Sequence, residues 1–168
     1  MNFNLFSFDK YFIIGRLFKY ELGFRLLSKE ISDVSSSIED IVGDLDGFVS
    51  DGMVDISEKK SIEATLQTLE KEKTDIEAQY NYWSSNSYLI DPLRTKYEET
   101  YNNYVSKYEE IVAIIDGIIY KDELVSDLDK NNMSKAHTNL CNALYSFIDR
   151  TNEVIEFTTL KQYEDLIS

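Results

Sequence analysis

Residues 13–48 read IIGRLFKYELGFRLLSKEISDVSSSIEDIVGDLDGF, and this stretch decides the fold. Large apolar residues recur in it at alternating steps of 4 and 3 from Ile13 to Phe48. A straight α-helix repeats about every 3.6 residues and drifts about 20° per heptad from such a pattern. A spacing of roughly 3.5 residues that is held over this length therefore predicts a left-handed supercoil. We expect a long heptad helix over residues 13–50.

The expected oligomer interface consists of two rows of this heptad helix. One row holds Leu17, Phe24, Ile31, Ile38 and Leu45, and the other holds Tyr20, Leu27, Val34, Ile41 and Phe48. Mixed Ile, Leu and aromatic residues at such positions favour more than two strands, and a homotrimer is the expected assembly. A second interpretation stays open, in which the same stripe is one face of a helix that lies on its own chain's bundle. The two interpretations differ in oligomeric state.

A turn and a helix start follow the heptad stretch. Asp51-Gly52 is typical of a turn, and Asp55 is the expected cap of a helix that begins at Ile56. Glu58, three residues after Asp55, completes a capping box. The expected buried side of this helix is apolar and aromatic: Ile62, Leu66, Leu69, Ile76, Tyr80 and Trp83.

Two more helices are expected after this one. The run Ser-Ser-Asn-Ser at 84–87 ends the first, and Pro92, with Asp91 as cap, opens the second. Gly117 is expected to stop the second helix. The last helix is expected from about Met133.

The expected fold class is therefore all-α. One proline and six glycines are too few for a many-stranded sheet with its frequent turns. Residues 51–160 are expected to form an antiparallel three-helix bundle, because three long helices are joined by short turns. Residues 161–168 are expected to be a C-terminal tail.

An aromatic segment over residues 1–12 precedes the heptad helix. It contains Phe3, Phe6, Phe8 and Phe12, a density of aromatic residues that predicts burial against something. The spacing fits an extended strand as well as a helix, so its conformation stays open. We expect these four phenylalanines to dock on a neighbouring protein.

Charge is distributed unevenly along the chain. The net charge is −14, yet residues 1–30 carry five basic and three acidic residues. Residues 31–58 carry eight acidic residues and no Lys or Arg. Affinity for nucleic acid comes from clustered cations, so direct binding to nucleic acid is not expected.

No constellation in the sequence supports catalysis, a metal or a cofactor. His137 and Cys141 are the only histidine and cysteine, and two ligands cannot close a tetrahedral metal site. The stretch around Asp51-Gly52 matches half of a calcium-binding loop, but Gly47 and Val49 would stand at its first ligand positions without side-chain oxygens. We expect a protein that is not an enzyme and that folds in a reducing cytoplasm, since one cysteine allows no internal disulfide.

The stretch Asp51-Gly52-Met53-Val54-Asp55-Ile56-Ser57-Glu58-Lys59 carries a resemblance to a known family. Together with a Tyr-rich helix and a final helix, it resembles a helical module of large tail and tail-tip proteins of bacteriophages. The likeness extends from Ile31 to about Val154. That family typically has Thr or Ser where this chain has Asp55, and Pro where it has Ile56. The resemblance implies a virion component with a spacer or assembly role.

The expected function is that of a phage virion structural protein, in the tail, baseplate, neck or a fibre. Its expected partners are further copies of itself and other virion proteins, and its expected location is the virion, with the host cytoplasm during assembly. The alternative from another class is a small acidic phage inhibitor that mimics nucleic acid against a host defence nuclease. A third possibility, attachment of residues 1–27 to a membrane surface, is less favoured.

Overall fold

Helices make up almost all of the chain that the structure describes. The computed structural model describes residues 29, 31–45, 47, 56–120 and 125–168. Its long helices are α2 (Ile56–Ser84), α3 (Leu93–Ile119) and α4 (Asp127–Ile167), and a further helical segment at 31–45 precedes them. No strand occurs in the described ranges. The all-α prediction is confirmed.

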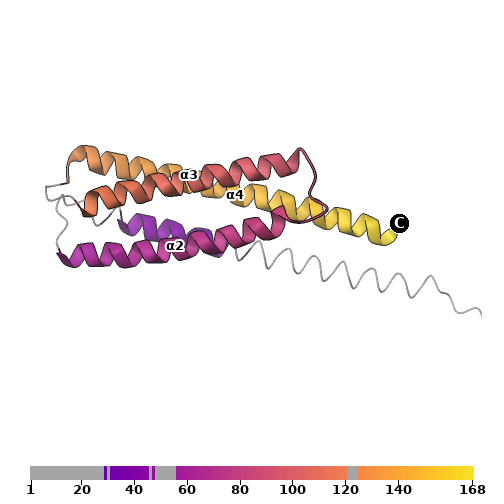
Figure 1. Cartoon of the computed structure of the whole chain (residues 1–168), viewed down its shortest axis with the longest axis horizontal. Coiled ribbons are helices and arrows are strands. Elements are labelled where there is room, and N and C mark those ends of the chain that lie inside the picture. Colours follow the sequence, from indigo (N-terminus) through magenta and orange to yellow (C-terminus); the bar gives the residue numbers. More distant parts are fainter. Residues whose placement is uncertain (1–28, 30, 46, 48–55, 121–124) are drawn as a thin grey trace, which may run out of the picture.

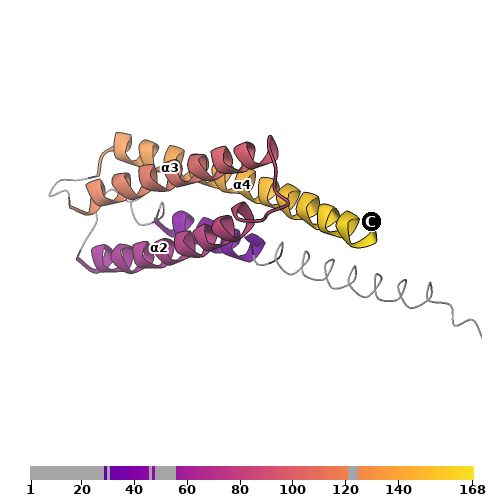
Figure 2. The same cartoon turned by 45° about the vertical axis from the view of Figure 1, so that its right-hand side comes forward.

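The helices lie side by side in an elongated, bundle-like body (Figure 1, Figure 2). Tyr80 near the end of α2 stacks on Tyr101 near the start of α3, with ring centroids 3.9 Å apart. At the other end of the body, Leu45, Ile62 and Met133 line one small cavity of about 10 Å³. Segment 31–45 therefore ends where α2 and α4 begin, and helices that follow one another along the chain run in opposite directions.

Each helix buries residues at intervals of seven. A stripe of this spacing stays on one side of helices that cross at a small angle of about 20°, so long helices can remain in contact along their lengths. The buried residues are Ile31, Ile38 and Leu45, then Ile62, Leu69, Ile76 and Trp83, then Tyr97, Tyr104, Ile111 and Ile118, then Met133, Leu140, Phe147 and Val154. They belong to one continuous hydrophobic core.

Helix α2 agrees closely with the sequence prediction. It begins at Ile56 and ends at Ser84, where the polar run starts. Four of the six residues predicted for its buried side are buried, while Leu66 and Tyr80 are partly buried and pack against the core. Asp55 lies outside the described residues, so its role as cap remains a prediction.

The side chain of Arg94 ties down the connection between α2 and α3. Its Nη1 donates to the carbonyl oxygen of Ser84 at 2.6 Å, and its Nη2 donates to that of Leu89 at 2.5 Å. Arg94 thereby satisfies a carbonyl at the end of α2 that has no partner within that helix. The cap of α3 is Pro92, without a side-chain hydrogen bond, so the prediction that Asp91 is the cap is wrong.

Helix α3 continues past Gly117, which was predicted to stop it. Ile118 and Ile119 form its last positions and are only 4% and 2% exposed. A glycine inside a helix costs about 1 kcal/mol, whereas burial of an isoleucine side chain contributes about 1.5–3 kcal/mol. Burial of the two isoleucines therefore outweighs the glycine.

Helix α4 begins before Met133 and continues through Ile167, so residues 161–168 are not a separate tail. Ser126 is its cap: the Ser126 hydroxyl accepts from the Asp129 backbone N–H at 3.2 Å. The Asp129 carboxylate in turn accepts from the Ser126 N–H at 2.9 Å. This reciprocal capping box fixes the helix start about two turns earlier than the apolar pattern does.

Candidate assembly interface

The residues of the predicted oligomer interface that the structure describes lie against the chain's own core. Ile31, Ile38 and Leu45 are 4%, 0% and 1% exposed, and Val34 and Ile41 are partly buried beside them. Over residues 31–45, the row of Ile31, Ile38 and Leu45 thus packs on the chain's own helices, as the second interpretation of the heptad pattern predicts. The remaining predicted interface residues lie outside the described residues, and their role stays a prediction: Leu17, Tyr20, Phe24, Leu27 and Phe48.

Segment 31–45 is rotated about its helix axis relative to the orientation that the two predicted rows require. The second buried row consists of Ser35 and Val42, at 4% and 0% exposure, and not of Val34 and Ile41. Successive residues of a helix differ by about 100° in direction, so a shift of one residue moves a row from the core to its border. Val34 and Ile41, which we call the border row, therefore lie between the core and the solvent.

Polar contacts hold segment 31–45 to its neighbours. The Ser37 hydroxyl donates to Glu72 Oε1 of α2 at 3.4 Å. On the other side, a hydrogen bond to the Glu39 carboxylate raises the pKa of the Tyr145 hydroxyl of α4. Burial, reinforced by the negative charge of Glu39, raises the pKa of the Cys141 thiol. The segment is thus fixed to both α2 and α4.

A cavity of about 320 Å³ lies between segment 31–45 and α2. It is lined by Ile31 and Val34 of the segment, by Asp75, Ile76, Ala78 and Gln79 of α2, and by Leu144 and Phe147 of α4. Asp75 and Ala78 are exposed, so the cavity meets solvent along α2. Gln79 Oε1 is sheltered from solvent and has no hydrogen-bond partner within the described part of the chain.

An aromatic cluster joins α3 to α4. The rings of Tyr97, Tyr101 and Tyr104 lie around that of Phe147, with centroids 5.5, 5.7 and 6.1 Å from it. The Thr151 hydroxyl lies 3.3 Å from the Tyr97 hydroxyl. Burial raises the pKa of Tyr101 to about 12 and raises the pKa values of Tyr97 and Tyr104 further. Tyr97 and Tyr104 are core residues, and Tyr101 is partly buried against the core.

The residues weighed for metal binding are not gathered into a site. His137 and Cys141 are half-buried on α4. Within the described ranges, no three His, Cys, Asp or Glu side chains are placed to hold a metal ion. Gly47 is exposed, and Val49 lies outside these ranges.

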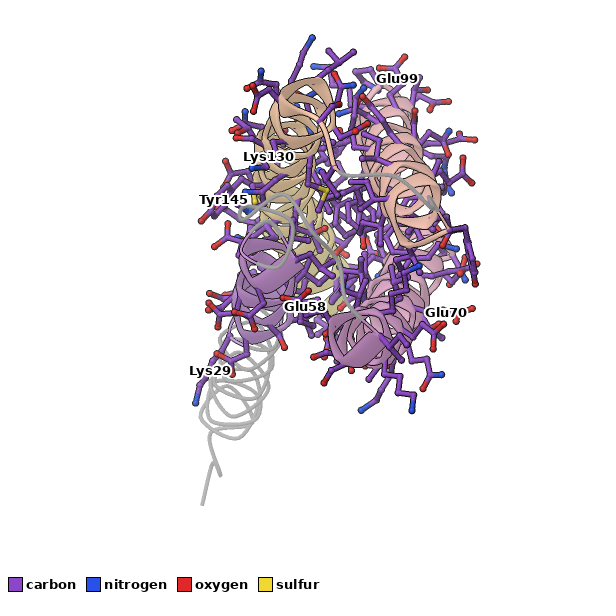
Figure 3. All side chains as sticks on the ribbon, turned by 90° about the vertical axis from the view of Figure 1, so that its left-hand side faces the viewer. Lys29, Glu58, Glu70, Glu99, Lys130 and Tyr145 are labelled. Atoms are coloured by element: carbon purple, nitrogen blue, oxygen red, sulfur yellow. The ribbon has the colours of Figure 1, made fainter. Side chains whose placement is uncertain are left out.

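Charged side chains cover the outside of the body. Glu70, Glu99 and Lys130 lie on the outer faces of α2, α3 and α4 (Figure 3). Several surface ion pairs join residues of the same helix, as between Lys161 and Glu164 at 2.7 Å, and exposed pairs of this kind contribute at most about 1 kcal/mol. None of the helices in the described part is long and apolar enough to cross a membrane.

Comparisons with protein-family models, with curated proteins and with solved structures found no match. Functional inference therefore depends on the residues of the chain itself. Of the predicted cap residues, Glu58 is partly buried in the first turn of α2. The predicted docking residues Phe3, Phe6, Phe8 and Phe12 lie outside the described residues, and their role also stays a prediction.

Proposed function

We propose that this chain is a non-enzymatic structural or assembly protein of a bacteriophage virion, in the tail, baseplate, neck or a fibre. It acts through helix packing and association with further copies of itself and with other virion proteins. The border row carries the proposal, since Val34 and Ile41 are apolar, incompletely covered and spaced by seven residues. In sequence this row continues at the same spacing to Leu27 and Phe48.

The proposed architecture gives the two rows different partners. Helices α2, α3 and α4 form an antiparallel three-helix unit, and the heptad helix over 13–50 packs on this unit with the row of Ile31 and Ile38. The border row is left to contact the same row of other copies. Large apolar side chains that are covered on association contribute roughly 25 cal/mol per Å² of area removed from water. Five such residues per copy are enough to favour a stable oligomer, and three copies are expected.

Light scattering of the purified protein, with one charged substitution in each row, tests this division. Ile41→Asp places a charge on the border row and should lower the mass of the assembly while each copy stays folded, because that side chain is only partly buried. Val42→Asp, the matched control, places a charge at a position of 0% exposure and should unfold the chain, as circular dichroism would reveal. A wild-type chain that is monomeric at every concentration would contradict the proposal.

A second test addresses the virion directly. An antibody against the chain should detect it in gradient-purified phage particles, at a constant ratio to the major structural proteins. A protein that stays in the lysate supernatant while the particles lack it would contradict a structural role in the particle.

The alternative of an acidic inhibitor is supported by the exposed carboxylates Asp33, Asp40 and Asp44 of segment 31–45. This segment carries four acidic residues over 15 positions, or about 22 Å of helix. Duplex DNA carries one charge per roughly 1.7 Å of its axis, so the segment has only about a third of that charge density. Salt-sensitive binding to a basic nuclease would favour this alternative over the virion role.

A further inference from the structure

We propose that the cavity between segment 31–45 and α2 is the docking site for the aromatic N-terminal segment, residues 1–12, of a second copy of this chain. The inference goes beyond the proposed function and does not depend on it, because copies could associate in this way without being part of a particle. Four properties carry it: the volume of the cavity, its lining, its charge and its distance along the chain from residues 1–12.

The volume fits one or two aromatic side chains. A cavity of roughly 150 Å³ with an apolar lining can hold a benzene ring, and this one measures about 320 Å³. Most of its lining is apolar, including Ile31, Ile76, Leu144 and Phe147. A phenylalanine side chain that enters would leave water for an apolar lining without displacing any part of the chain's own core.

The unpaired acceptor of Gln79 favours a peptide over a simple hydrocarbon ligand. Its Oε1 is sheltered and finds no donor among the described residues. An acceptor left in this state is destabilising, because it has lost its hydrogen bonds to water without replacing them. A polypeptide segment brings backbone N–H groups together with its side chains, and one of these can donate to Gln79.

Charge favours a basic segment. Asp75 lies at the cavity, and segment 31–45 and α2 together carry ten acidic and four basic residues, a net charge of −6. Residues 1–12 carry one acidic and one basic residue, Asp9 and Lys10, and the residues 13–28 that follow them carry three basic residues and one acidic residue. Opposite charges on two surfaces speed their encounter and disfavour wrong partners. The chain therefore contains a phenyl-rich segment that is followed directly by a stretch with an excess of cations.

The spacing along the chain favours a second copy over the same copy. The heptad pattern predicts that the helix continues from residue 31 back to residue 13, and each helical residue adds about 1.5 Å. Phe12 is 19 residues before Ile31, which corresponds to about 28 Å of helix. Such a helix carries residues 1–12 away from the cavity of their own copy and makes them available to another.

Two matched substitutions of the full-length chain test the site. Ala78→Phe fills the cavity from an exposed position, so the fold should persist. Ala64→Phe is the control, since Ala64 is also exposed on α2, two heptads earlier, and does not line the cavity. In light scattering over a range of concentrations, Ala78→Phe should weaken association at least about tenfold, the effect expected for the loss of one buried phenylalanine side chain. Ala64→Phe should associate as the wild type does.

A mixing experiment distinguishes docking between copies from docking within one copy. The triple variant Phe6→Ser, Phe8→Ser and Phe12→Ser removes the aromatic segment and leaves the cavity open, whereas Ala78→Phe retains the segment and closes the cavity. Each variant alone should show the weakened association. An equimolar mixture should recover complexes that contain both variants, because the segment of one copy can enter the cavity of the other.

Three results would overturn the proposal. These are a mass of Ala78→Phe equal to that of the wild type, an equal effect of Ala78→Phe and Ala64→Phe, and a mixture that behaves as the sum of its parts. If Ala78→Phe proved unfolded, Asp75→Lys would replace it, with Glu63→Lys, also exposed on α2, as its control. Asp75→Lys should weaken association several-fold at low salt, and equal effects of both lysine variants would reject the site.

Discussion

Helices α3 and α4 pack tightly against each other, whereas segment 31–45 and α2 leave a cavity of about 320 Å³ between them. Both pairs bury residues at the same seven-residue spacing. The difference lies in the residues between those positions: α4 buries the small residues Ala136 and Ala143, which let a neighbouring helix approach closely. The shared spacing of apolar residues thus allows all of these helices to pair, and side-chain size affects how closely they pack.

The largest expected effect is alkaline unfolding of the α3–α4 pair. Burial raises the pKa values of Tyr97 and Tyr104 above their usual value near 10, so the unfolded chain loses these protons at a lower pH than the folded chain. The stability contribution is therefore complete below about pH 10 and falls as the pH rises. Each tyrosine should lower the free energy of unfolding by about 1.4 kcal/mol per pH unit, on the order of 5 kcal/mol in all by about pH 12.

Urea unfolding at a series of pH values measures this effect. Tyr104→Phe should make the alkaline decline less steep, since it removes one of the two buried hydroxyls. Tyr120→Phe is the control, because Tyr120 is 75% exposed. Equal profiles for these two variants would show that the buried tyrosines do not cause the decline.

Removal of the ring shared by both regions ranks next. Phe147 lies among the tyrosines of α3 and also lines the cavity, so Phe147→Ala would weaken one region and enlarge the gap in the other. We expect a loss of about 3–5 kcal/mol in the free energy of unfolding, measured by urea denaturation. Tyr145→Ala, at a position 52% exposed on the same helix, should cost much less. Similar losses for both variants would argue against a core that is centred on Phe147.

A matched pair of enlargements tests the difference in packing itself. Ala143→Leu adds volume where α4 is tightly packed and should cost about 1–3 kcal/mol through overpacking. Ala78→Leu adds the same atoms beside the cavity, where there is room for them, and should leave stability unchanged or raise it. Thermal unfolding at low protein concentration compares the two, and equal destabilisation would mean that the cavity is not available to a side chain.

The smallest expected effects come from two exposed helical glycines. At Gly117 of α3 and Gly43 of segment 31–45, an added Cβ would meet nothing within 4 Å. Substitution of either by alanine should stabilise its helix by about 0.5–1 kcal/mol. Hydrogen exchange can locate the gain: Gly43→Ala should slow exchange mainly within segment 31–45 if this segment opens separately from the α3–α4 pair. A uniform change over all helices would instead indicate a single cooperative unit.

Features that depend on local sequence could be predicted. The start of α2 at Ile56 and its buried residues follow from apolar spacing, which is a property of the helix alone. The start of α4 was equally accessible, because Ser126 and Asp129 have capping-box spacing in the sequence. The apolar pattern becomes clear only at Met133, and for that reason it misplaces the boundary.

Features that depend on neighbouring helices could not be predicted. Rotation of segment 31–45 buries Ser35 in place of the more apolar Val34, and only contact with α2 and α4 determines this choice. The path of α3 beyond Gly117 likewise depends on the surroundings of Ile118 and Ile119. The cavity arises from the way three helices meet, and no single helix carries a signal for it.

Helices that repeat every seven residues could pair equally well after sliding by one repeat, a shift of about 10.5 Å. Such a slip of α3 along α4 would place Tyr97 opposite Thr158 and Tyr104 opposite Thr151, so that each hydroxyl would still meet another. The seven-residue spacing and these hydroxyl pairs alone therefore do not fix the register of α3 on α4. Against α2 the register of α3 is fixed from outside the repeat, because the hydrogen bonds of Arg94 to Ser84 and Leu89 hold the start of α3 at one distance from the end of α2. In this molecule the short connection thus sets how far α3 can slide along α2.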